Sequence, residues 1–189
     1  ENAKGEKFIT FFGAIYDLEL KTLVYINAGH NPPILVKSSG EQVLLEEGCI
    51  VLGALPELPF INEGFITGLS DFLLFCYTDG VTETSSENGE DFGQESLLKY
   101  FSKKENVLKD LSTIHQDLIV ALDTHKGRNA YHDDITMLSC RVSWFVDVLI
   151  IDVLIRLFGN VLINLIIWDL RIWKWKTRHC EEQRGLWAG

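Results

Sequence analysis

Residues 72–83 read FLLFCYTDGVTE, and this stretch decides the fold of the chain. An unbroken run of apolar, strand-favouring residues stops at an Asp-Gly pair, which is typical of a strand buried on both faces. Such a strand would deliver the carboxylate of Asp79 to the rim of the core. Gly80 would allow a sharp turn, or a close approach of its carbonyl group to a ligand. An ordinary hairpin turn also explains an Asp-Gly pair, so the chemistry depends on a second stretch.

That second stretch is residues 132–140, which read HDDITMLSC. Asp133 and Asp134 stand directly before a strand-like run. Neighbouring residues of a strand face opposite ways, so only one of the two carboxylates can point where Asp79 points. Carboxylates that meet at one edge of a sheet suit a hard cation such as Mg²⁺ or Mn²⁺. The two stretches together predict a divalent-cation site.

Length and composition limit the class of protein. A chain of 189 residues with 47% hydrophobic residues is long and apolar enough for one domain with a substantial core, and it is not disordered. The formal net charge of −10 argues against nucleic-acid binding, which requires a basic face. The four cysteines have no zinc-ligand spacing, which favours a reducing, cytoplasmic setting.

The first half of the chain is strand-rich. Residues 8–26 and 34–45 each read as a hairpin, and residues 60–67 read as a further short strand. The segment between the two hairpins, residues 27–33, reads NAGHNPP and is dense in turn-forming residues. We therefore expect sequential antiparallel strands up to the end of the 72–83 stretch.

The second half changes to helical periodicity. A helix is expected to begin near Phe92, and apolar residues at helical spacing predict another helix over residues 107–123. His115 and His125 have no partner at ligand spacing, so we expect both to be exposed. The predicted fold class is α+β: an antiparallel β-sandwich with helices packed on one face.

Residues 143–189 depart from this pattern and are predicted to form a unit separate from residues 1–142. Residues 145–167 are apolar and long enough to cross a bilayer, but the charges of Asp152 and Arg156 offset the gain from insertion. We expect a hydrophobic helix followed by a Trp-rich basic end. A membrane anchor is possible and not favoured; a packing helix, an oligomer contact and sequence foreign to the domain remain open.

Six motifs, taken together and in order, carry a family resemblance. The chain resembles the SpoIIE-type branch of the metal-dependent PPM serine/threonine phosphatases, over about residues 6–142 and the C-terminal two-thirds of that domain. The motifs are Phe8-x-Thr10 with its hairpin, the NAGHNPP segment at 27–33, Leu52-Gly53, YTDGVTE at 77–83, Phe92-Gly93 and Asp133-Asp134-Ile135-Thr136.

The resemblance implies a two-metal Mn²⁺ or Mg²⁺ site at one end of the sandwich. It places the metal-binding residues at Asp79, Gly80 and Asp133, of which the two aspartates match the family's two later metal aspartates. Thr78 and Asp134 are expected to support these ligands without touching the metal. The implied partner is a phosphorylated protein, such as an anti-sigma factor antagonist carrying phosphoserine or phosphothreonine.

Two further residues of these motifs are interpreted as structural. His30 suggests a general acid, but its place in the NAGHNPP turn favours a turn-stabilising role. Glu83 is interpreted in the same way, and no residue is assigned as catalytic.

One departure from the family limits the functional prediction. The family's first metal aspartates precede the Phe-x-Thr strand, whereas no Asp-Gly motif precedes Phe8 here, so the domain is expected to be incomplete at its N-terminal side. Two late aspartates cannot hold two cations alone. The resemblance implies a phosphatase in the parent protein and leaves the activity of this fragment open. An inactive binding module and a domain tethered to the membrane by its tail are the alternatives.

Overall fold

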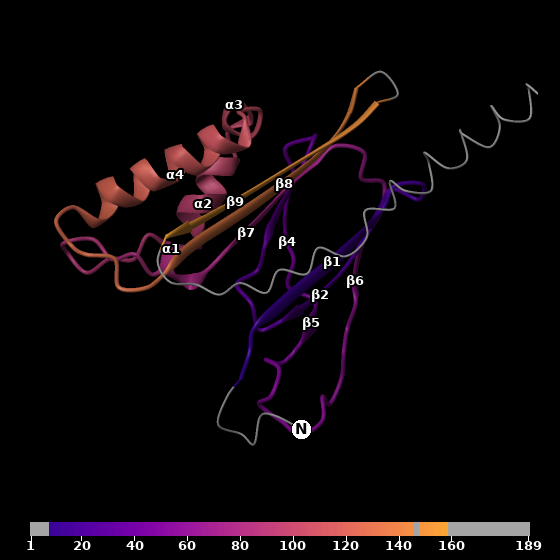
Figure 1. Cartoon of the computed structure of the whole chain (residues 1–189), viewed down its shortest axis with the longest axis horizontal. Coiled ribbons are helices and arrows are strands. Elements are labelled where there is room, and N and C mark those ends of the chain that lie inside the picture. Colours follow the sequence, from indigo (N-terminus) through magenta and orange to yellow (C-terminus); the bar gives the residue numbers. More distant parts are fainter. Residues whose placement is uncertain (1–7, 146–147, 159–189) are drawn as a thin grey trace, which may run out of the picture.

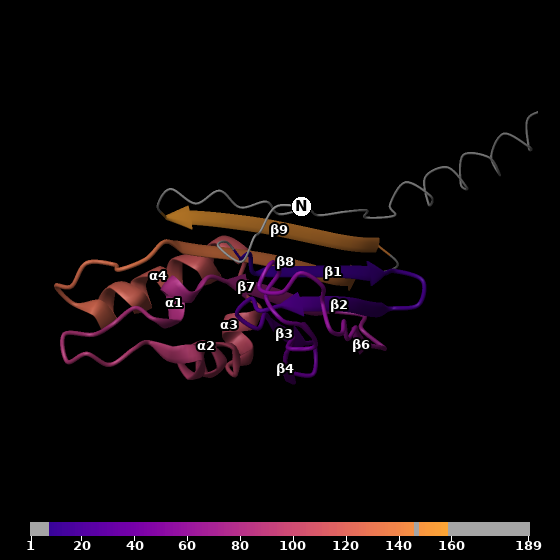
Figure 2. The ribbon, with the colours of Figure 1, turned by 90° about the horizontal axis from the view of Figure 1, so that it is seen from below.

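The computed structural model describes residues 8–145 and 148–158, which form two β-sheets and a helical layer (Figures 1 and 2). The smaller sheet has the order β1-β2-β5, and β6 pairs antiparallel with residues 23–25 of β2. The larger sheet has the order β4-β3-β7-β8-β9. The bounds of the strands are β1 Phe11–Asp17, β2 Thr22–Ala28, β3 Ile34–Lys37, β4 Gln42–Leu44, β5 Gly48–Cys49, β6 Gly64–Ile66, β7 Phe72–Tyr77, β8 Ile135–Phe145 and β9 Val148–Phe158.

The helices lie on the face of the larger sheet that points away from the smaller sheet (Figure 1). Their bounds are α1 Asp79–Thr82, α2 Gly93–Phe101, α3 Lys104–Val107 and α4 Leu111–Lys126. The predicted class, an antiparallel β-sandwich flanked by helices, is confirmed.

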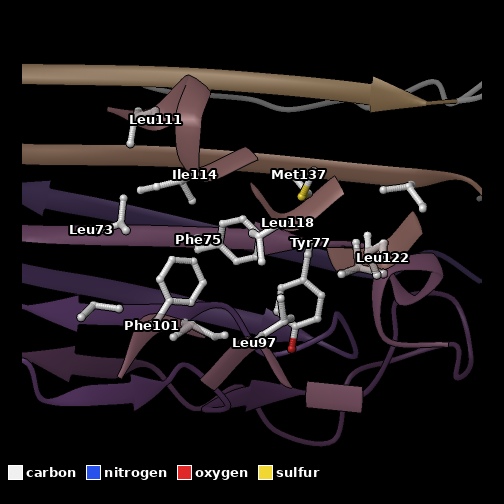
Figure 3. Packing of buried hydrophobic residues seen from close by; sticks show 14 residues of the cluster. Leu73, Phe75, Tyr77, Leu97, Phe101, Leu111, Ile114, Leu118, Leu122 and Met137 are labelled. Carbon is white, nitrogen blue, oxygen red and sulfur yellow. The ribbon is translucent and has the colours of Figure 1, made fainter. Parts of the chain in front are cut away.

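Strand β7 lies between β3 and β8 and is buried on both faces, as its sequence predicts. Leu73, Phe75 and Tyr77 point into the cluster beneath the helices (Figure 3). Phe72 and Leu74 alternate with them and pack against the smaller sheet. This period of two explains why the run is apolar without interruption, since neither face of the strand meets solvent.

The apolar stripe of α4 closes the cluster on its other side. Leu111, Ile114, Leu118 and Leu122 recur at spacings of three or four residues and are all buried against the sheet (Figure 3). The helix begins after Asp110, whose side chain accepts a hydrogen bond from the backbone N–H of Thr113 at 2.9 Å. This carboxylate satisfies one of the backbone donors that the first helical turn leaves without a partner.

His115 is fully buried, so the prediction that it is exposed was wrong. It stands four residues after Leu111, within the apolar stripe of α4, and its ring meets the edge of Phe75. Its Nε2 lies 2.8 Å from Oγ of Ser139 on β8. A polar group on the stripe of a helix can be buried when the facing strand offers a hydrogen-bond partner. His125, at the end of the helix, is partly exposed.

The expectation of purely sequential antiparallel pairing was also wrong, because β2 pairs with β6 and β3 pairs with β7, and one pair is parallel. Strand β5 pairs with β2 in parallel, through Asn27 with Gly48 and Ala28 with Cys49. The chain changes sheets between β2 and β3, between β4 and β5, and between β6 and β7. Strands that are neighbours in sequence therefore often belong to different sheets.

Residues 148–158 form strand β9, so the predicted helix was wrong for this part of the tail. β9 pairs antiparallel with β8 along its whole length, from Ile135 opposite Phe158 to Phe145 opposite Val148. Valine and isoleucine make up nearly half of the strand, and β-branched residues favour an extended backbone. The rest of the predicted tail helix, residues 159–167, and the Trp-rich end lie outside the described residues. The division into residues 1–142 and 143–189 stays a prediction. Within residues 8–145 and 148–158, no helix has the length and apolar character needed to cross a membrane.

Candidate functional site

Thr78 joins the end of β7 to the start of β8. Its backbone N–H donates to the carbonyl oxygen of Thr136 at 3.1 Å, which extends the strand pairing one residue beyond Tyr77 opposite Met137. Its hydroxyl donates to the carbonyl oxygen of Asp134 at 2.9 Å and accepts from the backbone N–H of Thr136 at 2.9 Å. Three hydrogen bonds from one residue therefore fix the two strand ends side by side.

Gly80 brings the chain after β7 directly against the segment before β8. A Cβ atom at this position would lie 2.6 Å from the carbonyl oxygen of Asp134, closer than side chains approach a backbone atom. The absence of a side chain at Gly80 is therefore what permits the contact. Its carbonyl oxygen accepts a hydrogen bond from the Thr84 hydroxyl at 2.7 Å. A role for this carbonyl as a metal ligand stays a prediction.

Asp79 and Asp133 flank this contact and share one hydrogen-bond pattern. Both residues are exposed. In each, Oδ1 accepts the backbone N–H of the next residue, at 3.0 Å for Gly80 and 2.7 Å for Asp134. No residue in the described ranges forms an ion pair with either carboxylate. The second oxygen of each carboxylate is thus available to a ligand, at one end of the larger sheet.

His30 reaches the same end of the sheet from the NAGHNPP turn between β2 and β3. Its backbone N–H donates to Oδ1 of Asn27 at 2.8 Å. Burial lowers the pKa of the His30 imidazole, and the negative charge of Asp79 acts on it in the opposite direction. Sequence reasoning interpreted His30 as a turn residue; the signal that would have placed it here is the antiparallel pairing of β3 with β7.

The donor set fits part of a site for a hard divalent cation. Mg²⁺ and Mn²⁺ prefer oxygen ligands, and Mg²⁺ commonly takes one or two carboxylates and retains several waters. Asp79 and Asp133 supply two such carboxylates. Among the described residues, no group of three or more histidine, cysteine or acidic side chains could hold a metal ion. The assignments of Asp79, Gly80 and Asp133 to metal, and of Thr78 and Asp134 to their support, stay predictions.

Residues 1–143 match the family described as Stage II sporulation protein E (SpoIIE). The chain belongs to the SpoIIE family. Protein IcfG of Synechocystis sp. is 32% identical over 143 residues, which are 74% of this chain and 21% of IcfG. The chain thus spans about a fifth of that curated SpoIIE relative.

Two solved structures share the fold. Both are of the phosphatase domain of the cell fate determinant SpoIIE from Bacillus subtilis, the second presoaked with Mn. The TM-scores are 0.51 and 0.55 at 16% and 15% identity. The matches cover 71% and 72% of this chain, and 59% and 57% of the two solved chains. The resemblance to the PPM phosphatase fold, and to its SpoIIE branch, is confirmed. PPM phosphatases are metal-dependent as a family.

Proposed function

We propose that this chain is part of a metal-dependent protein phosphatase that removes phosphate from phosphoserine or phosphothreonine in a bacterial signalling system. The observation that carries the proposal is the pair of exposed aspartates, Asp79 and Asp133, on strand ends that Thr78 links. Membership of the SpoIIE family supports it. The proposed substrate is a small phosphorylated regulator, such as an anti-sigma factor antagonist, in the cytoplasm.

The residues of this chain would hold a cation and orient it. Asp79 and Asp133 would hold Mn²⁺ or Mg²⁺ through the carboxylate oxygens that the backbone leaves available. Thr78 and Gly80 would keep the two carboxylates at a constant separation, because they fix the backbone on both sides. When bound, the cations supply an activated water and positive charge for in-line displacement at phosphorus.

A second candidate function is a binding module that has the PPM fold and does not hydrolyse phosphoproteins. It is favoured by one observation, that the described residues present no group of three metal-ligating side chains. Such a module would present its surface to a regulatory partner.

The variant Asp79→Asn separates these two functions. In the full-length protein it should reduce Mn²⁺-dependent hydrolysis of a phosphoserine protein by several orders of magnitude, since it removes the charge that holds the cation. Asparagine retains the volume and one carbonyl oxygen, so the fold should survive. The assay is phosphate release at saturating Mn²⁺, with circular dichroism to verify folding.

Asp134→Asn is the matched control. The backbone carbonyl of Asp134, and not its side chain, accepts from Thr78, so this variant should cost much less activity. Near-normal hydrolysis by a folded Asp79→Asn protein would defeat the phosphatase proposal, and the binding module would replace it.

A further inference from the structure

A buried asparagine holds His30 at the metal end of the sheet. Asn27 is 4% exposed, and its side chain uses both of its functional groups. Oδ1 accepts from the backbone N–H of His30 at 2.8 Å, and Nδ2 donates to the carbonyl oxygen of Leu45 at 3.0 Å. The position of His30 is therefore fixed by a hydrogen-bonded residue of the core.

The strand register places His30 and Asp79 at the same end of β3 and β7. Strands β3 and β7 are antiparallel, with Ile34 opposite Phe75. The residues before Ile34 consequently run beside the residues after Phe75. His30 stands four residues before Ile34, and Asp79 stands four residues after Phe75. The effect of the Asp79 charge on the His30 imidazole agrees with this placement.

A phosphoryl group at this edge needs hydrogen-bond donors as well as cations, because it is an anion. Three donors of the residues next to the two aspartates in the sequence are already used within the chain. The Thr78 hydroxyl donates to the carbonyl oxygen of Asp134, and the backbone N–H groups of Gly80 and Asp134 donate to the aspartates themselves. An imidazole ring has at least one N–H donor in either protonation state. His30, which is half-buried, thus carries a side-chain donor at the same end of the sheet as Asp79.

We propose that the His30 imidazole donates a hydrogen bond to a phosphoryl oxygen of the bound phosphoserine or phosphothreonine substrate, and that Asn27 positions it. This inference rests on the proposed phosphatase function. It gives the NAGHNPP segment a role in the site beyond stabilising a turn.

The first experiment measures inorganic phosphate as a competitive inhibitor of the full-length protein. His30→Ala should raise both the inhibition constant of phosphate and the KM for the phosphoprotein by roughly tenfold, the effect of one charge-assisted hydrogen bond. His30→Gln retains an N–H donor and should recover part of this loss. The concentration of Mn²⁺ for half-maximal activity should stay unchanged, because His30 contacts the substrate and not the metal.

His125→Gln is the matched control. Nε2 of His125 lies 2.9 Å from the carbonyl oxygen of Glu90, and this histidine belongs to the end of α4. The inhibition constant of phosphate for the His125→Gln variant should equal that for the unmodified protein. If His30 only stabilises the turn, His30→Ala will lower the thermal midpoint and leave the inhibition constant of phosphate unchanged. That result would overturn the proposal.

A second measurement does not depend on catalysis. The ring C–H signals of the histidines are followed by NMR in the full chain with Mg²⁺ while inorganic phosphate is added. The His30 signals should shift, and the His125 signals should not. An unshifted His30 ring overturns the phosphate contact. If the full-length protein releases no phosphate from phosphoserine proteins at any Mn²⁺ concentration, the proposed function fails, whereas unchanged inhibition in an active His30→Ala variant defeats this inference alone.

Discussion

Two apolar sheet faces of this molecule differ in what covers them. On the larger sheet, Phe75 lies beneath α4 and is fully buried, as is Leu118 above it. On the outer face of the smaller sheet, Ile15 is 63% exposed and Phe65 is 61% exposed. The second pair belongs to one row across the sheet, since Ile15 is opposite Val24 and Val24 is opposite Phe65.

The difference shows that an apolar row in a strand becomes core only when another element covers it. Strand β7 and strand β1 are both rich in aromatic and aliphatic residues, but helices cover β7, and no described element covers the outer face of β1. A contiguous exposed apolar patch on a soluble protein is usually a contact surface or an aggregation risk. Substitutions on the two faces should therefore have very different consequences.

The largest expected effect is on the covered face. Leu118→Ala removes buried methyl groups from the centre of the cluster and should lower the free energy of unfolding by about 2–5 kcal/mol. Val120→Ala on the same helix is the control, because Val120 is exposed and its loss should cost less than about 0.5 kcal/mol. Urea unfolding of both variants measures the difference. Equal losses would mean that α4 does not close the core.

A smaller effect on stability is expected from loss of the hydrogen bonds that Asp117 makes between α4 and the neighbouring helical residues. Oδ2 of Asp117 on α4 accepts from Lys109 at 2.7 Å and from the Tyr100 hydroxyl of α2 at 2.9 Å. These hydrogen bonds lower the pKa of Asp117 below its ordinary value. The resulting stabilisation is present above the unfolded-state pKa and is lost as the pH falls through the lower folded-state pKa.

The same network can be tested with Asp117→Asn. Because the pair is about one-third exposed, the contribution should be less than about 1 kcal/mol. The variant should be less stable than the unmodified protein near pH 6 and nearly equal to it at a pH below the folded-state value. Urea midpoints at the two pH values measure this, and a constant difference across that range would contradict the assignment to Asp117.

The smallest effect on stability is expected on the uncovered face. Phe65→Thr keeps a strand-favouring residue on β6 and should change the free energy of unfolding by no more than about 0.5 kcal/mol. It should reduce the binding of a hydrophobic dye and any self-association, because it removes an exposed aromatic ring. Dye fluorescence and sedimentation velocity measure these properties. A loss comparable with that of Leu118→Ala would show that this face is covered in solution.

The sequence predicted most where a periodic pattern and a motif agreed. The run at 72–77 predicted a buried central strand ending at Asp79, and the spacing of Leu111, Ile114, Leu118 and Leu122 predicted α4 within a few residues. Both patterns arise because neighbouring elements bury these segments, and burial leaves apolar residues at a regular spacing in the sequence.

The failures came from partners that local sequence does not show. His115 is buried because Ser139 faces it across the core, twenty-four residues away. Residues 148–158 form a strand because β8 offers an edge for pairing, which the apolar run alone could not reveal. The position of His30 at the same end of the sheet as Asp79 likewise follows from the pairing of β3 with β7.

The hydrogen bonds of Thr78 and the close contact of Gly80 have a consequence for the entropy of ligand binding. They fix the backbone on both sides of Asp79 and directly after Asp133 when the sheet forms. The conformational entropy of bringing the two aspartates together is therefore lost on folding and not when a ligand arrives. A cation that binds at this edge would order two side chains and no strand, so its affinity would depend chiefly on charge and on the removal of water.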